Sequence, residues 1–170
     1  FMDLVRQADV VFDNFSVGVP ARLGIDHAAL TQVNPRIITC SVTGFGETGP
    51  EIHRPAFDQV VQAMGGGMSI TGTPETGPTR SGIPIGDLGG GIFGTMGVLA
   101  AIAERERTGL GQHVDVSMLD AQISMLNYMA TMYLMSGQVP EGIGNSHFVH
   151  VPYNSYPTAD GHIIVACIGD

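Results

Sequence analysis

Short apolar runs alternate with longer amphipathic stretches along the whole chain. Runs rich in valine, isoleucine and phenylalanine predict four buried strands, at residues 8–15, 36–42, 113–117 and 162–167. The intervening segments have helical spacing and end signals, which predict helices at residues 26–33, 55–64, 88–107 and 118–135. Strands that alternate with helices predict an α/β fold with a mostly parallel sheet.

The ends and faces of these helices carry further signals. Asp26 is placed to cap one helix, and Ser117 with Asp120 forms a Ser-x-x-acid capping arrangement for another. In the helix at 88–107, small residues recur every three or four positions on one face: Gly90, Gly94, Gly97 and Ala101. An interior glycine costs up to about 1 kcal/mol relative to alanine, so we expect close packing against this face.

Composition narrows the classes of function. The net charge of −9 argues against a nucleic-acid partner, which requires a basic surface. All seven basic residues are arginine, which suits a phosphate or carboxylate ligand, although a general compositional bias explains this equally well. No apolar run approaches the roughly 20 residues of a membrane span, so no membrane partner is expected. Cys40 and Cys167 lie in apolar runs, which predicts buried, reduced thiols and a cytoplasmic location.

Asp87 is the leading candidate for chemistry. It follows a short extended piece at 82–85 and precedes a glycine-rich helix start, the position at which ligands meet α/β sheets. A carboxylate at such a position can act as a covalent nucleophile. The local sequence taken alone favours another role, in which Asp87 is the N-cap of the helix that follows.

Other candidates are weaker on local evidence. Asn14, Phe15 and Arg22 combine an amide, an aromatic ring and a guanidinium, a set that can bind an adenine and its phosphates, but the local sequence alone favours ordinary loop residues and a surface arginine. The turn at 43–46 lacks a complete phosphate-binding pattern. His147 and His150 are three residues apart without a nearby cysteine or carboxylate cluster, so we predict no metal site.

Several blocks of the chain, in order, resemble the class III CoA-transferase family, which includes formyl-CoA and carnitine CoA-transferases. The blocks are residues 8–24 (ADVVFDNFSVGVPARLG), 34–50 (NPRIITCSVTGFGETGP), 54–72, 84–87, 107–120 and 145–170. The resemblance implies a Rossmann-like, mostly parallel sheet with flanking helices, in a fragment of a two-domain fold that forms interlocked homodimers. Residues 1–142 then correspond to the middle of the large domain, and residues 143–170 to the linker and the start of the small domain. Both ends of the chain are expected to be cut from a longer protein.

The resemblance also implies an activity. Asp87 matches the nucleophile of acyl-CoA:carboxylate CoA transfer, which passes through a mixed anhydride and then an aspartyl-CoA thioester. The substrates are an acyl-CoA donor and a carboxylic acid acceptor, with coenzyme A and no metal. Phe57 and Asp58 match an aromatic–acid pair beside the nucleophile, usually Tyr-Glu in formyl-CoA transferases. The glycine-rich helix start is expected to give some of the backbone N–H groups that stabilise the oxyanions.

Other residues of the chain match family positions that bind the nucleotide of coenzyme A. Asn14, Phe15 and Arg22 match family residues that contact it, and Arg54 is a candidate substitute for a lysine found in some relatives. Asp120, by contrast, matches a structural position.

Two alternatives remain open at this point. Racemases that act on α-methylacyl-CoA share the family's fold, but they pair the aspartate with a histidine at the position of Phe57. Phenylalanine cannot transfer a proton, so racemisation is disfavoured. The other alternative is a non-catalytic CoA-binding module.

Overall fold

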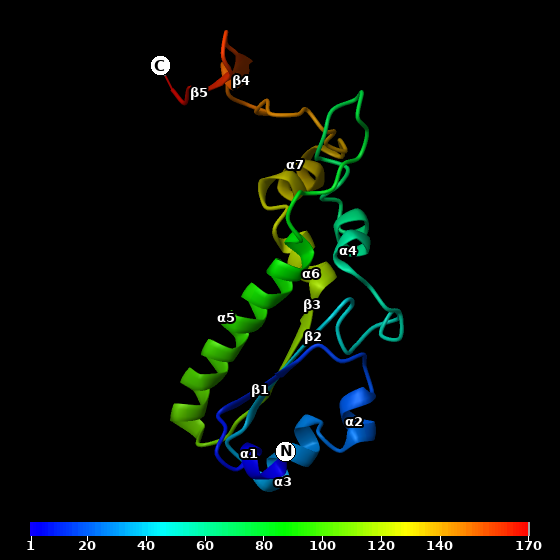
Figure 1. The fold of residues 1–170 in the computed structure, drawn as a ribbon, viewed down its shortest axis with the longest axis vertical. Coiled ribbons are helices and arrows are strands. Elements are labelled where there is room, and N and C mark those ends of the chain that lie inside the picture. Colours follow the sequence, from blue (N-terminus) through cyan, green and yellow to red (C-terminus); the bar gives the residue numbers. More distant parts are fainter. Residues whose placement is uncertain (170) are drawn as a thin grey trace.

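The computed structural model describes residues 1–169, and Asp170 lies outside the described residues. Figure 1 shows an elongated molecule in which one long helix runs beside a small sheet. In chain order the elements are α1 (Met2–Val5), β1 (Val10–Asp13), α2 (Val19–Leu23), α3 (His27–Val33), β2 (Ile38–Thr43), α4 (Asp58–Met64), α5 (Ile85–Thr108), β3 (His113–Ser117), α6 (Met118–Ser124), α7 (Tyr128–Ser136), β4 (Tyr153–Pro157) and β5 (His162–Ala166).

The main sheet has the order β1-β2-β3, and both of its strand pairs are parallel. β4 and β5 form a separate antiparallel pair at the end of the molecule opposite α1 and α3 (Figure 1). The predicted α/β class, with a parallel sheet and flanking helices, is confirmed. The domain boundary expected at 142/143 stays a prediction, and its second part includes Asp170, which the structure does not describe.

β2 is the central strand and is buried at every one of its six positions. One face of the strand carries Cys40 and Val42, which belong to the core beneath α5 together with Val116 and Met118. A central strand buried on both sides explains why the sequence reads as a continuous apolar and small-polar run.

The small-residue face predicted for the long helix packs directly on the sheet. A Cβ added at Gly90 would lie 2.8 Å from Val42 Cγ1, and one at Gly97 would lie 2.5 Å from Val114 Cγ1. Gly94 lies over Cys40, so α5 runs antiparallel to β2. The helix therefore begins at the carboxyl ends of the parallel strands, where α/β proteins bind ligands.

Several predicted boundaries differ from the structure. The helix expected at 118–135 is two helices, α6 and α7, because Asn127 adopts a left-handed φ of 51° between them. The extended piece expected at 82–85 is a bend, and α5 already begins at Ile85. α4 begins at Asp58, so Pro55 precedes the helix instead of opening it. Cys167 is exposed, whereas Cys40 is buried as predicted.

The composition of α5 also departs from expectation. By length and composition alone, α5 is long and apolar enough to cross a membrane. Its best 18-residue window has a mean hydropathy of 1.5. The expectation that no such run exists is therefore wrong. Core helices of soluble proteins pass the same test, and the glycine face of α5 is packed on the sheet as in a core helix. Its opposite face exposes apolar side chains, at Leu88, Ile92, Met96 and Leu99.

The close packing of α5 makes a stability prediction. Gly97→Ala should lower the free energy of unfolding by about 1–3 kcal/mol, because Val114 is stiff at its χ1 angle and cannot move aside easily. Gly91→Ala is the matched control, since a Cβ there meets nothing within 4 Å. It should raise the same free energy by about 0.5–1 kcal/mol. Urea unfolding followed by circular dichroism measures both, and equal effects of the two substitutions would contradict the packing argument.

Candidate active site

The first turn of α5 is held by the side chain of Asp58, which is the first residue of α4. The Gly86 N–H donates to Asp58 Oδ1 at 2.8 Å, and the Asp87 N–H donates to the same oxygen at a longer 3.4 Å. A helix start leaves N–H groups unpaired and carries partial positive charge, so a carboxylate stabilises it in two ways. The N-cap residue of α5 is Pro84, and no side chain at that position caps the helix. The interpretation of Asp87 as the N-cap is therefore wrong.

Asp87 lies in the first turn of α5 with its side chain exposed. Partial burial raises the pKa of the Asp87 carboxyl, and the negative charge of Asp58 raises it further. Within residues 1–169, the Asp87 carboxylate accepts no hydrogen bond, whereas that of Asp58 accepts three. Asp87 is thus a carboxylate that the fold presents to solvent at the carboxyl edge of the sheet.

The backbone donors at this helix start are already paired. Besides the two N–H groups bound to Asp58, the Ile85 N–H donates to the Ile83 carbonyl at 2.8 Å and the Leu88 N–H to the Pro84 carbonyl at 2.9 Å. The expectation that this helix start supplies oxyanion donors is therefore wrong for its first four N–H groups.

A groove of about 470 Å³ is lined by residues that include Phe57, the chain neighbour of Asp58. Three segments line it, namely residues 14–17 after β1, residues 43–45 after β2, and residues 52–57 before α4. The first two segments come from the carboxyl ends of neighbouring parallel strands, so the sheet itself brings them together. Phe57, whose side chain is 81% exposed, lines the groove, and its chain neighbour, Asp58, contacts the backbone of Asp87.

Four predicted site residues meet in this groove: Asn14, Phe15, Arg54 and Phe57. The Asn14 amide donates to the Val42 carbonyl, which fixes the segment after β1 against β2. The guanidinium carbon of Arg54 lies 5.5 Å from the centroid of the Phe45 ring, and the group also pairs with Glu51 at 3.2 Å. Arg54 is therefore a cation held within the groove wall.

Arg22 is not among the groove residues. It is exposed on α2, and its Nη1 atom lies 3.8 Å from the point where a Cβ of Gly18 would stand. Gly18 follows the groove segment 14–17 directly, so Arg22 lies near the groove without lining it. Ser117 caps α6 as expected, because the Asp120 N–H donates to Ser117 Oγ at 3.1 Å. The structural role of the Asp120 side chain stays a prediction.

Two residues of the site were not predicted from the sequence. Phe45 supports Arg54, and nothing in its local sequence marks it apart from a loop position. Gln62 is buried and donates to Asp58 Oδ2 at 2.7 Å. Its spacing of four residues from Asp58 along a helix is a signal that could have identified it. Among residues 1–169, no group of three or more potential ligand side chains could hold a metal ion.

Comparisons with known proteins find similar sequences over the whole chain. The chain is 42% identical to acetyl-CoA:oxalate CoA-transferase of Acetobacter aceti over 171 residues, which is 100% of this chain and 44% of that protein. It is 42% identical to succinate–glutarate CoA-transferase of Agrobacterium fabrum, over 98% of this chain and 42% of the relative. The chain thus spans less than half the length of these relatives.

The fold has a close match among solved structures. A crystal structure of a CaiB/BaiF family protein from Brucella suis superposes with a TM-score of 0.92 at 39% identity, over 98% of this chain and 44% of the other. The model of CoA-transferase family III matches residues 1–170. The chain therefore belongs to CoA-transferase family III.

Proposed function

We propose that the complete protein is an acyl-CoA:carboxylate CoA-transferase in which Asp87 is the nucleophile. The observation that carries this proposal is the exposed Asp87 carboxylate, without a hydrogen-bond donor in the described chain. The backbone of Asp87 is held by Asp58, the residue after Phe57, and Phe57 lines a groove together with matched CoA-binding positions. The relatives named above are CoA-transferases that act between carboxylic acids, which supports the same class of reaction.

The reaction follows from the chemistry of a carboxylate and a thioester. Asp87 attacks the acyl carbonyl of the donor, and the carbon–sulfur bond breaks to give an aspartyl mixed anhydride and the CoA thiolate. The thiolate attacks the aspartyl carbonyl and expels the donor carboxylate, which leaves an aspartyl-CoA thioester. The acceptor carboxylate attacks this thioester and releases the thiolate. The thiolate then attacks the acceptor's acyl carbonyl, which forms the new acyl-CoA and regenerates Asp87.

The groove fits the part of coenzyme A that does not react. Phe15, which is 45% exposed, offers a ring for adenine to stack on. Arg54 lines the groove, and Arg22 lies near its 14–17 segment; both offer forked donors to phosphate. We assign these three residues and Asn14 to coenzyme A, and Phe57 and Asp58 to the surroundings of the nucleophile. The interlocked homodimer, the small-domain assignment of residues 143–170 and the cytoplasmic location belong to the same proposal.

Racemisation is the less favoured activity. It requires an acid–base partner for Asp87 at the position of Phe57, and the phenyl ring that the structure presents there has no ionisable proton. Transfer requires only one carboxylate nucleophile.

The covalent role of Asp87 is tested by substitution and trapping. Asp87→Ala should lower the rate of exchange between labelled carboxylic acids and a panel of acyl-CoA esters at least about 10³-fold, because the nucleophile is lost. CoA binding should persist in this variant. Hydroxylamine added during wild-type turnover should convert Asp87 to a hydroxamate, detected by peptide mass spectrometry.

Asp120→Ala is the matched control, because Asp120 is also exposed at the third position of a helix, α6. It should leave the exchange rate within about twofold, as surface substitutions generally do. An active Asp87→Ala variant would contradict the covalent role. Deuterium from solvent at the α carbon of the product would instead indicate racemisation.

The electrostatic coupling between Asp58 and Asp87 is tested by the pH profile of kcat/KM. The attacking carboxylate must be ionised, so the rate should rise with pH through the pKa of Asp87, which is raised above the usual aspartate value. Asp58→Asn removes a negative charge while keeping an oxygen that can accept the Gly86 N–H. The acid limb of the profile should therefore move to lower pH. Because burial is the larger cause of the raised pKa, the pKa of Asp87 in this variant should still lie above the usual aspartate value. A limb that stays in place, or moves upward, would show that this charge does not act on Asp87.

A further inference from the structure

Gln62 is an interior amide placed between α4 and the segment that leads into α5. Its side chain is 1% exposed and makes hydrogen bonds at both ends. The amide nitrogen donates to Asp58 Oδ2 at 2.7 Å and makes a longer contact of 3.5 Å with the Ile83 carbonyl. The amide oxygen accepts the Ser81 N–H at 2.8 Å.

These bonds complete a chain of contacts that reaches the proposed nucleophile. Asp58 uses Oδ2 to accept from Gln62 and Oδ1 to accept from Gly86, so both of its oxygens are held. Gln62 also holds Ser81, which lies on the other side of the bend before α5. The bend that presents Asp87 is thus fixed at both sides by one side chain.

The space around this bend is tight. A Cβ added at Gly86 would lie 3.1 Å from Asp58 Oδ1 and 3.1 Å from Val61 Cγ1. A carboxylate turned by a different rotamer would lose its bond to the Gly86 N–H. The donor that Gln62 directs at Oδ2 favours the observed orientation of the carboxylate.

We propose that Gln62 is a positioning residue for CoA transfer, which acts through Asp58 to fix the first turn of α5 and the charge beside Asp87. The inference rests on the proposed function, since it concerns the step carried out by Asp87. Gln62 itself lies in the interior and is not expected to touch the substrate.

Two substitutions in the complete protein separate positioning from simple structural support. Gln62→Met keeps the side-chain length but removes both hydrogen bonds. It should lower kcat about 10²-fold at every pH, the cost expected when a reacting group is misplaced by about 1 Å. The KM for acyl-CoA should stay within about twofold, because Gln62 does not line the groove.

Gln62→Glu adds a dependence on pH. The protonated carboxyl group can donate to Asp58 Oδ2 and accept from the Ser81 N–H, as the amide does. Once ionised, it offers no donor and repels Asp58. The ratio of variant to wild-type kcat should therefore be near one at the lowest pH at which both fold and should fall as the pH rises.

Gln122→Met is the matched control. Gln122 is also an interior glutamine, 5% exposed, and it packs against Gly65 and Gly67 without a bond to Asp58. Its amide oxygen has no hydrogen-bond partner in the part of the chain that the structure describes. Its replacement should leave kcat within about twofold and cost little stability, because no bonded partner is left unsatisfied.

Amide hydrogen exchange gives a readout that does not depend on activity. The Gly86 amide should lose protection in Gln62→Met and keep it in Gln122→Met. Unchanged protection, a kcat equal to that of the control, or a pH-independent ratio for Gln62→Glu would each overturn the positioning role. If Gln62→Met does not fold, the pH dependence of Gln62→Glu still decides. Failure of the proposed function is distinguished by the wild type, which would then show neither transfer nor a hydroxamate at Asp87.

Discussion

The arrangement at the start of α5 depends on one contact, the carboxylate of Asp58 against the first turn of that helix. A long helix concentrates partial positive charge and unpaired N–H groups at its start, and Pro84 offers no side chain to satisfy them. Asp58 meets that need from α4, and in doing so it ties the two helices together at the carboxyl edge of the sheet. Asp87 therefore does not cap the helix, and its side chain can face the solvent.

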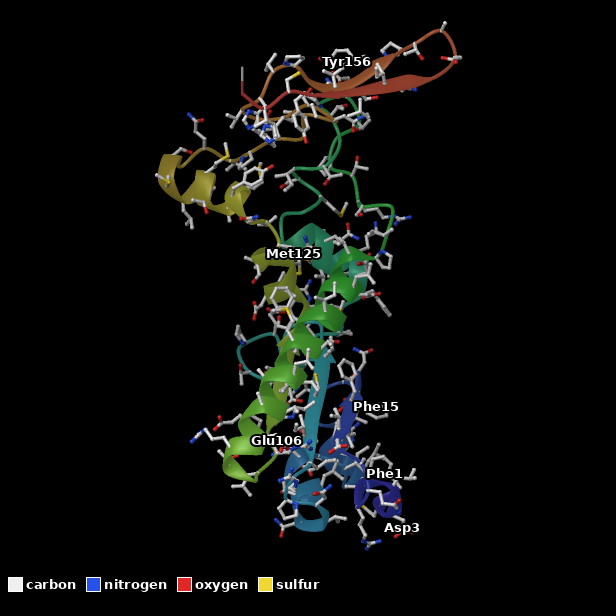
Figure 2. The ribbon with its side chains drawn as sticks, turned by 90° about the vertical axis from the view of Figure 1, so that its left-hand side faces the viewer. Phe1, Asp3, Phe15, Glu106, Met125 and Tyr156 are labelled. Carbon is white, nitrogen blue, oxygen red and sulfur yellow. The ribbon has the colours of Figure 1, made fainter. Side chains whose placement is uncertain are left out.

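Asp58 and Asp87, which are joined by a hydrogen bond from the Asp87 N–H, therefore have carboxylates in different surroundings. Asp58 accepts three hydrogen bonds, two of them from the first turn of α5. Asp87 accepts none in the described chain, and partial burial together with the charge of Asp58 raises the pKa of its carboxyl. Figure 2 shows Glu106 near the C-terminal end of α5 and Met125 beside the start of the helix. Met125 Cε would meet a Cβ added at Gly89.

Features that depend on residues close to one another in the sequence could be predicted from it. The caps at Asp26 and Ser117 and the glycine face of α5 are local patterns, and each is present as expected. The break at Asn127 was missed because asparagine, although enriched at positive φ, stands inside an apolar, methionine-rich run that reads as one helix. The expected place of Asp87 at the carboxyl edge of the sheet rested on an extended piece directly before it, and the structure has a bend there; α5 reaches that edge by running antiparallel to β2. The Asp58 cap on α5 and the bond from Ser81 to Gln62 join segments about 20 to 30 residues apart, which no local pattern records.

The covalent geometry of the chain also links binding to chemistry. Phe57 is one of the residues that line the groove assigned to coenzyme A, and the next residue along the chain, Asp58, holds the backbone that carries Asp87. Binding energy from a part of the substrate that does not react can raise the rate only if it is used to place the reacting atoms. Phe57 in the groove and Asp58, which holds the backbone of Asp87, are joined by one peptide bond. Binding in the groove can therefore help to place the reacting atoms. The nucleotide end of an acyl-CoA, once bound along residues 14–17, 43–45 and 52–57, would then fix its thioester against the one element whose position Asp58 sets.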